Sequence, residues 1–166
     1  MERLILMRHA KAVPDREAPD DHARMLTERG RTDARDAGAA LAARELRADR
    51  VLVSTAARAR ETWALAGAML GEPATDFRDP LYMADHETLW AEALRAEAAT
   101  VMIVAHNPGL HALAAFLIQR AHDRSRLART VSEGMPPAAW AAFSIGGHNL
   151  AAAGATLIDA WTPKSS

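Results

Sequence analysis

The sequence predicts an α/β fold: a three-layer α/β/α sandwich with a mostly parallel central sheet, whose final strands form a hairpin. Two observations lead to this expectation. Short apolar runs alternate along the chain with longer segments of helical periodicity, which is typical of parallel sheets covered by helices on both faces. The length of 166 residues suits one compact domain, so we expect residues 1–166 to form a single unit.

Five segments have the composition of strands. The first three are short continuous apolar runs, as expected for strands that are buried on both faces of a sheet. The last two are joined through residues 146–149, where two glycines and an asparagine predict a hairpin turn. The five segments are residues 4–7, 51–53, 100–105, 138–145 and 155–161.

Four segments have the periodicity and composition of helices. Thr27 is a suitable N-cap for the first helix, and Gly71 followed by Pro73 ends the second. Residues 14–24 are polar and contain two prolines, so we expect a surface loop there. The four helices are expected at residues 27–47, 56–70, 85–98 and 110–121.

Composition excludes several classes of function. The formal net charge of −1 provides no global positive field for nucleic acid or an anionic membrane, so any anion site must be local. The absence of cysteine excludes disulfides, thiolate metal sites and a cysteine nucleophile. The first apolar run is too short for a signal peptide or a membrane span, and we expect a cytoplasmic protein. Arginine replaces lysine almost throughout, which we attribute to a codon bias of bacterial type.

Polar side chains follow three of the predicted strands. Arg8 and His9 follow the first strand. Ser54 follows the second, with Arg58 one turn into the next helix, and His106 follows the third. Ligands bind at the carboxyl ends of parallel strands, so we expect these residues to converge in one crevice. Two guanidiniums and a helix N-terminus can bind phosphate oxygens there, and a neutral imidazole can attack phosphorus.

Each of these features has a simpler explanation when it is taken alone. Arg8 could form a surface ion pair while His9 caps a turn, and residues 106–109 could form only a strand-to-helix turn. Their combination at the ends of successive strands favours a functional site. His111 lies five residues after His106, which is not the spacing of a helical metal pair, so we predict no metal site.

Four segments of the chain resemble, in order, the motifs of the histidine phosphatase (phosphoglycerate mutase-like) superfamily. Residues 6–12 are similar to its opening R-H-G/A signature, and residues 21–30 to its D-x-x-R-x-L-T-x-x-G stretch. Residues 51–62 resemble its V-x-S-x-x-x-R-x-x-x-T segment, and residues 104–108 its V-x-H-N block. The short chain, Ala10-Lys11 and the sequence at 135–137 resemble the SixA-type phosphohistidine phosphatases within this superfamily.

The resemblance implies a metal-independent phosphatase that needs no cofactor. His9 would accept the phosphoryl group as a covalent phosphohistidine, which water then hydrolyses. Arg8, Arg58 and His106 would bind the phosphoryl oxygens and stabilise the transition-state charge, with Ser54 and Asn107 in the phosphate-binding set.

The proton donor of larger family members has no clear counterpart in this sequence. The position of their glutamate aligns with Met83. Asp85 and Glu87 are near enough to substitute, although favourable charge at a helix N-terminus explains them more simply. Without an acid, alkoxide leaving groups are disfavoured, whereas the labile phosphoramidate bond of phosphohistidine is tolerated.

Three functions therefore remain in competition. The first is a protein phosphohistidine phosphatase, whose partner would be a phosphorylated protein. The second is a small-molecule phosphomonoesterase of the same superfamily, and the third is a catalytically silent phosphate-binding or interaction module. The oligomeric state stays open, and a monomer fits the sequence. A basic run could dock an acidic partner, but a solvated loop is the simpler prediction; it comprises Arg120, Arg124, Arg126 and Arg129.

Overall fold

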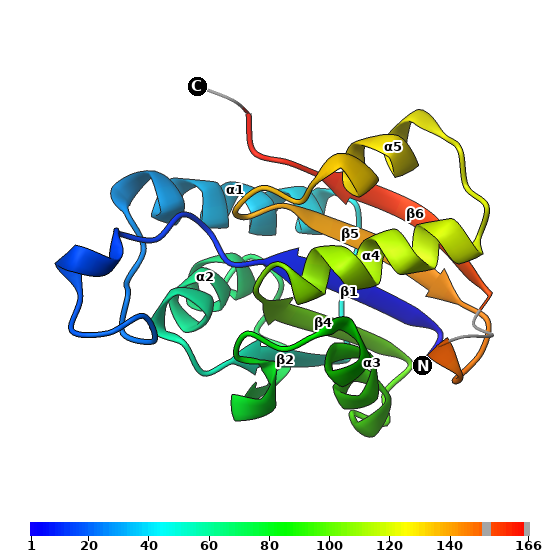
Figure 1. Cartoon of the computed structure of the whole chain (residues 1–166), viewed down its shortest axis with the longest axis horizontal. Coiled ribbons are helices and arrows are strands. Elements are labelled where there is room, and N and C mark those ends of the chain that lie inside the picture. The colour runs from blue at the N-terminus through cyan, green and yellow to red at the C-terminus, as the bar shows by residue number, and fades with distance from the viewer. Residues whose placement is uncertain (151–153, 165–166) are drawn as a thin grey trace.

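The computed structural model describes residues 1–150 and 154–164 and contains a six-stranded sheet between two layers of helices (Figure 1). The strand order is β3-β2-β4-β1-β5-β6. The first four of these strands pair in parallel, whereas β5 runs antiparallel to both β1 and β6. The strands are β1 (Arg3–Arg8), β2 (Arg50–Ser54), β3 (Ala74–Arg78), β4 (Thr100–Ala105), β5 (Trp140–Ile145) and β6 (Ala155–Trp161).

Helices cover both faces of this sheet, which confirms the predicted fold class. Two helices, α1 (Glu28–Ala43) and α2 (Ala57–Gly67), pack on one face. On the other face lie α3 (His86–Arg95), α4 (Gly109–Arg120) and α5 (Arg126–Glu133). Two short 3-10 helices complete the described elements, η1 at Asp15–Glu17 and η2 at Asp79–Leu81.

Strand β1 has a continuously apolar sequence because it packs against helices on both faces of the sheet. Leu4 and Leu6 belong to the core beneath α3 and α4, whereas Ile5 and Met7 belong to the core beneath α1 and α2. All four side chains are fully buried, because helices cover both faces of the strand. Burial of a side chain of this size contributes roughly 1.5–3 kcal/mol, so β1 is a rigid base for the residues that follow it.

Close packing of α1 on α2 explains a glycine that would otherwise weaken a helix. A Cβ atom at Gly38 would lie 2.4 Å from the Ala66 carbonyl oxygen, so a side chain there would force the helices apart. Thr27 caps α1 as predicted, with its side chain accepting from the backbone N–H of Gly30 at 3.0 Å. The helix ends at Ala43, four residues before the predicted boundary.

One strand and one α-helix were not expected from the sequence, and one connection differs from its prediction. The edge strand β3 has a single large apolar side chain, the half-exposed Phe77, and therefore no strand-like pattern. The predicted basic loop instead contains α5, which buries only Ala128 and Val131. The β5–β6 connection runs from residue 146 to 154, which is longer than the predicted four-residue turn, and its residues 151–153 lie outside the described part.

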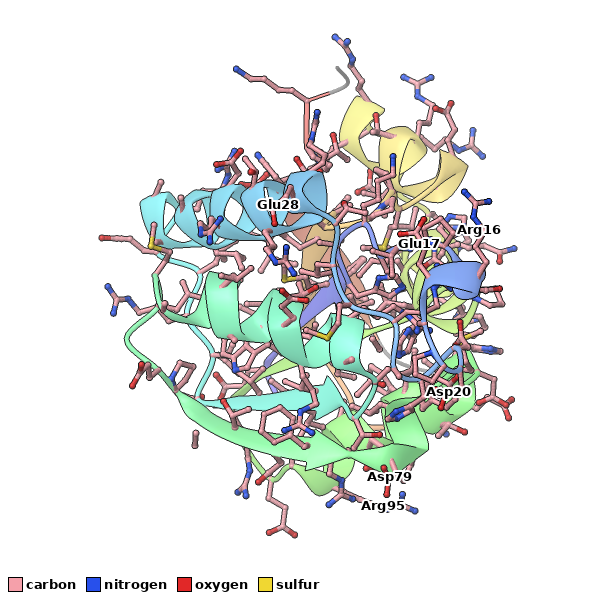
Figure 2. All side chains as sticks on the ribbon, turned by 90° about the vertical axis from the view of Figure 1, so that its left-hand side faces the viewer. Arg16, Glu17, Asp20, Glu28, Asp79 and Arg95 are labelled. Atoms are coloured by element: carbon pink, nitrogen blue, oxygen red, sulfur yellow. The ribbon has the colours of Figure 1, made fainter. Side chains whose placement is uncertain are left out.

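The carboxyl ends of the parallel strands lie at one end of the molecule, which faces the viewer in Figure 2. There η1, with Arg16 and Glu17, and the following Asp20 lie to one side, while Glu28 marks the start of α1. Within residues 1–150 and 154–164, no helix is long and apolar enough to span a bilayer.

Candidate active site

Three neighbouring strands deliver the predicted site residues to the same edge of the sheet. Residue pairing aligns Arg8 of β1 with Ala105 of β4, the residue before His106. Strand β2 lies on the other side of β4 and ends at Ser54. The structure brings His9 and His106 together, with their ring centroids 5.0 Å apart. The structure thus brings together polar side chains that follow different strands of the sheet.

The His9 ring is held in one orientation by the backbone. Its Nδ1 lies 2.8 Å from the carbonyl oxygen of Ala10, which can only accept, so Nδ1 carries the proton. The other ring nitrogen, Nε2, is therefore unprotonated, and its lone pair accepts a hydrogen bond from the Arg58 Nε at 3.3 Å. Burial, together with the charges of Arg58 and Arg8, lowers the pKa of His9 to about 4. His9 is thus a neutral imidazole between two cations at neutral pH.

The pH profile tests this protonation state directly. We expect kcat/KM to fall only when the pH drops through about 4, where His9 of the free enzyme gains a proton, rather than through 6.5. The sign follows from the role of the ring, because only the unprotonated Nε2 can attack an electrophile. The profile is measured with 4-nitrophenyl phosphate at concentrations below its KM and corrected for ionisation of the substrate, with circular dichroism at each pH to exclude unfolding. Half-loss of kcat/KM near pH 6.5 in the folded protein would contradict the buried, cation-flanked setting of His9.

His106 is an almost fully buried member of the cluster. It is 2% exposed, and its Nε2 lies 2.7 Å from the hydroxyl of Ser54. Burial, with His9 and Arg58 nearby, lowers the pKa of His106 to about 3. Its buried Nδ1 has no hydrogen-bond partner among the described residues. A buried ring nitrogen without a partner is costly, so a bound ligand that satisfies it would be stabilised.

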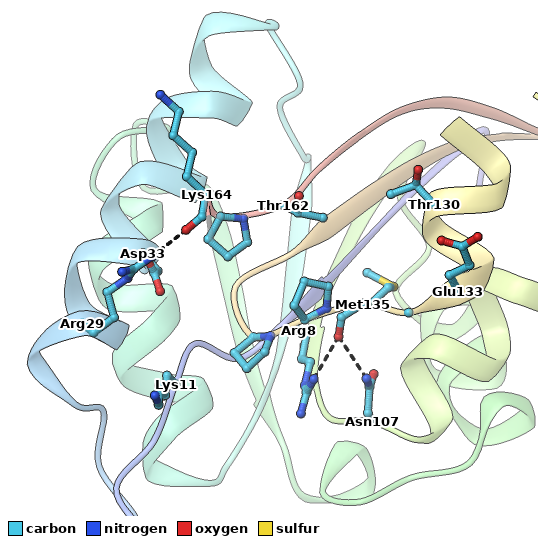
Figure 3. A pocket seen from close by; sticks show the side chains of 14 residues that line it. Arg8, Lys11, Arg29, Asp33, Asn107, Thr130, Glu133, Met135, Thr162 and Lys164 are labelled. Carbon is cyan, nitrogen blue, oxygen red and sulfur yellow. Dashed lines mark hydrogen bonds and ion pairs between the residues drawn. The ribbon is translucent and has the colours of Figure 1, made fainter. Parts of the chain in front are cut away.

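Arg8 and Asn107 are both anchored to one carbonyl group. The Arg8 Nη1 and the Asn107 Nδ2 donate to the carbonyl oxygen of Met135, at 2.9 and 3.1 Å (Figure 3). The Nε of Arg8 and the Oδ1 of Asn107 are buried and have no partner in the described part of the chain. The segment before β5 therefore fixes the direction of both side chains and leaves polar atoms available for a ligand.

Sequence reasoning missed Asp21 as part of this centre. The buried Arg58 donates from Nη2 to the Asp21 carboxylate at 3.0 Å and from Nη1 to its backbone oxygen at 2.5 Å. Tyr82 donates its hydroxyl to the same carboxylate at 2.5 Å. The hydrogen bond from Tyr82 and those from Arg24 and Arg58 hold the pKa of Asp21 well below its usual range. The sequence does contain a signal for this residue, because Asp21 opens the D-x-x-R-x-L-T-x-x-G stretch at residues 21–30, to which the sequence alone assigned no role.

The two possible proton donors named from the sequence, Asp85 and Glu87, lie outside the hydrogen-bonded cluster. Asp85 is the N-cap of α3, where its carboxylate accepts from the backbone N–H of Thr88 at 2.8 Å. That hydrogen bond lowers the pKa of Asp85, so the group is a carboxylate at neutral pH. Glu87 and Met83 are exposed. Among the described residues, neither Asp85 nor Glu87 forms a hydrogen bond or ion pair with His9, Arg8, Arg58 or His106.

The assembled site has the chemistry of phosphoryl transfer. Two guanidiniums provide hydrogen-bond donors, and the neutral imidazole beside them has an unprotonated Nε2. These cations can supply positive charge of the kind that a metal ion provides in other phosphoryl-transfer enzymes. In the described ranges, no cluster of three or more His, Asp or Glu side chains has the arrangement of a metal site.

Comparison with known proteins identifies close relatives. A model of the histidine phosphatase superfamily (branch 1) matches residues 4–79. An uncharacterised protein of Mycobacterium tuberculosis is 38% identical over 145 residues, 86% of this chain and 89% of the relative. A candidate phosphohistidine phosphatase SixA of Nakamurella multipartitia is 32% identical, with a TM-score of 0.85 over 99% of this chain and 97% of that structure.

Two further solved structures show how far the similarity extends. A candidate phosphohistidine phosphatase SixA of Agrobacterium tumefaciens is 30% identical, with a TM-score of 0.82 and 98% of each chain covered. A mycobacterial glucosyl-3-phosphoglycerate phosphatase has a TM-score of 0.67 at 19% identity, with 99% and 100% of the two chains covered, and shares the fold.

Proposed function

Because this chain belongs to the histidine phosphatase superfamily, and within it to the SixA-type phosphatases, we propose that it acts through a covalent phosphohistidine on His9. The single observation that carries the proposal is the setting of the His9 ring. Its Nδ1 is bonded to the Ala10 carbonyl, and its unprotonated Nε2 accepts from the Arg58 guanidinium, a group suited to bind phosphoryl oxygens.

The reaction then proceeds in two displacements. Arg8 and Arg58 bind the phosphoryl oxygens, and the His9 Nε2 attacks phosphorus as the bond to the leaving group breaks. Water next attacks phospho-His9, inorganic phosphate leaves, and Nε2 regains its lone pair. His106 offers a ring nitrogen to the phosphoryl oxygens, while Ser54 and Asn107 orient the neighbouring groups.

We propose phosphohistidine on a protein as the substrate. The support is the state of two carboxyl groups, since Asp85, the candidate acid, is an ionised N-cap and Asp21 of the cluster is held ionised by its donors. A site that supplies no carboxylic acid suits an imidazole leaving group, because the ring takes a proton from solvent on its distal nitrogen and then departs as neutral imidazole. The alternative substrate is a small phosphomonoester, and the shared fold with a sugar-phosphate phosphatase keeps that class in the test.

A substrate panel tests the proposal. We expect hydrolysis of a phosphohistidine peptide to exceed that of a phosphoserine peptide of the same sequence and of simple sugar phosphates. Preference for a sugar phosphate would assign the protein to the small-molecule phosphomonoesterases. No turnover of any compound, with phosphate binding retained, would favour a silent binding module.

Inhibition distinguishes side-chain charge from metal-ion catalysis. We expect vanadate or tungstate to inhibit competitively with substrate, because trigonal-bipyramidal vanadate resembles the phosphoryl-transfer transition state and the site binds anions through guanidiniums. Chelation by EDTA should leave the rate unchanged. Loss of activity with EDTA that zinc or magnesium restores would contradict the proposed mechanism.

A further inference from the structure

The guanidinium of Arg58 is buried, and each of its three nitrogens has a partner. The side chain is 3% exposed. Its Nη1 donates to the backbone oxygen of Asp21 at 2.5 Å, and its Nη2 donates to the carboxylate of the same residue at 3.0 Å. Its Nε donates to the His9 Nε2 at 3.3 Å. Because a guanidinium is planar and rigid, the two bonds to Asp21 fix the direction in which the Nε–H points.

Tyr82 in turn fixes the Asp21 carboxylate. Its hydroxyl donates to Oδ2, the oxygen that also accepts from Arg58, at 2.5 Å. Arg24 donates to the other oxygen, Oδ1, at 2.9 Å. The bond from Tyr82 is the main reason why the pKa of Asp21 lies below its usual range, and the same bond raises the pKa of Tyr82. The carboxylate therefore stays charged and the hydroxyl keeps its proton at neutral pH.

The ring of Tyr82 lies against the same cluster. Its centroid is 5.5 Å from that of His106 and 4.9 Å from that of His22, edge-to-face in both cases. The guanidinium carbon of Arg58 is 5.9 Å from the centre of the ring. These contacts involve the ring and not the hydroxyl, so the bond to Asp21 can be removed by substitution while the ring stays in place.

A carboxylate is electrostatically unfavourable beside a site for anions. Asp21 repels a phosphoryl group at Arg58, so it should weaken the binding of phosphate in the ground state. What it provides is a donor with a fixed direction. When the lone pair of the His9 Nε2 becomes the bond to phosphorus, the Arg58 Nε–H loses its acceptor and can donate to a phosphoryl oxygen. Donors that are fixed in advance stabilise a transition state without reorganisation.

We propose that Asp21 and Tyr82 form a positioning pair that fixes the Arg58 guanidinium for the transition state of phosphoryl transfer and weakens the binding of free phosphate. The inference rests on the proposed function, since it takes Arg58 to bind the phosphoryl oxygens during attack by His9. Asp21 acts through Arg58, and Tyr82 acts through Asp21. Neither side chain touches the reacting atoms.

Two conservative variants each change one member of the pair. Asp21→Asn removes the charge and keeps the backbone oxygen that accepts from Arg58, whereas Tyr82→Phe removes only the hydroxyl. We expect kcat for 4-nitrophenyl phosphate to fall about 30-fold in the first and about fivefold in the second, because a misdirected donor is felt in the transition state. Since Tyr82 acts through Asp21, the double variant should lose no more than Asp21→Asn alone. Losses that multiply would contradict this order of action.

The binding of inorganic phosphate provides a readout of opposite sign. Calorimetry should show that Asp21→Asn binds phosphate at least as tightly as the wild-type protein, and up to about fivefold more tightly, because the repulsion by a carboxylate is gone. A residue that only supports the fold of the site would lower the phosphate affinity and kcat together. A parallel loss of both in a folded Asp21→Asn protein would therefore overturn the inference.

The matched control is Asp20→Asn, the same change of charge one residue earlier in the chain (Figure 2). Asp20 is exposed, and its carboxylate accepts from the backbone N–H of Ala23 at 2.8 Å, which an asparagine oxygen can also do. Its kcat should stay within about twofold of wild type. An equal loss in this control would overturn the inference, as would unchanged kcat in both Asp21→Asn and Tyr82→Phe.

NMR of the arginine side chains keeps the test independent of turnover. A buried, hydrogen-bonded N–H exchanges slowly with water, and its signal is assigned to Arg58 by its absence in Arg58→Lys. We expect a sharp Nε–H signal in the wild-type protein and a broadened one in Asp21→Asn. If no phosphate ester is hydrolysed but this contrast and the tighter phosphate binding hold, the proposed function fails and the fixing of Arg58 by the pair stands. If substrate is turned over and both variants keep the rate and the signal, only the positioning pair is refuted.

Discussion

Replacing His9 by alanine is expected to abolish turnover while the fold and most phosphate binding remain. The ring contributes its Nε2 to chemistry at the end of β1, whereas the core beneath it is formed by Leu6 and Met7. Arg8 and Arg58 keep their anchors on Met135 and Asp21 in this variant. Loss of covalent catalysis costs orders of magnitude in rate, so activity should fall below about 1% of wild type.

The matched control is His111→Ala, since this ring lies on α4 and contacts the Ser132 carbonyl at 3.0 Å. It should retain nearly full activity. Steady-state kinetics, thermal unfolding and tungstate binding are measured for both variants. Activity above about 1% in a folded His9→Ala protein would exclude His9 as the nucleophile.

Activity is expected to depend strongly on the leaving group. Phosphoramidates and aryl phosphates should react faster than alkyl phosphates of similar size, because in the proposed mechanism no carboxylic acid protonates an alkoxide. A general acid contributes about 10²–10⁴-fold, so the rate difference should be of that order. The comparison uses kcat/KM for a phosphohistidine peptide, 4-nitrophenyl phosphate and an alkyl phosphate.

Two conservative variants complete this experiment. Asp85→Asn keeps a good N-cap for α3, and Glu87→Gln changes an exposed side chain, so neither should disturb the fold. We expect both to change the rate less than twofold on every substrate, which is the effect of an exposed substitution away from the reacting atoms. If either variant lost 10²-fold or more on the alkyl phosphate, a carboxylic acid would be acting, and the preference for phosphohistidine would lose its main support.

The fold could be predicted because its central strands are buried from both sides. Such strands have continuous apolar sequences, as β1 and β4 do, and these sequences are distinctive. The edge strand β3 forms its ladder with β2 alone and leaves Phe77 half exposed, so its sequence has no such pattern. Helix α5 packs through only two buried side chains, and its arginine-rich sequence is typical of a solvated loop.

The site residues that directly follow strands could be predicted from the sequence. Those that reach the site from segments distant in sequence could not. Arg8, His9 and His106 are marked by the abrupt change from apolar to polar sequence. Asp21 and Tyr82 reach Arg58 and each other only through tertiary structure, and both lie in segments without clear periodicity. The Met135 carbonyl that anchors Arg8 is a backbone group, which residue identity does not reveal.

The most direct test is to trap the phosphoryl group on the protein. The enzyme is mixed with a phosphohistidine peptide, quenched in alkali, which preserves phosphohistidine, and digested for peptide mass spectrometry. The account predicts a phosphoryl group on His9 that appears within one turnover, decays as phosphate is released, and is absent from the His9→Ala variant. Turnover of the same substrate with no modification of His9, or with the phosphoryl group on another residue such as His106, would contradict it.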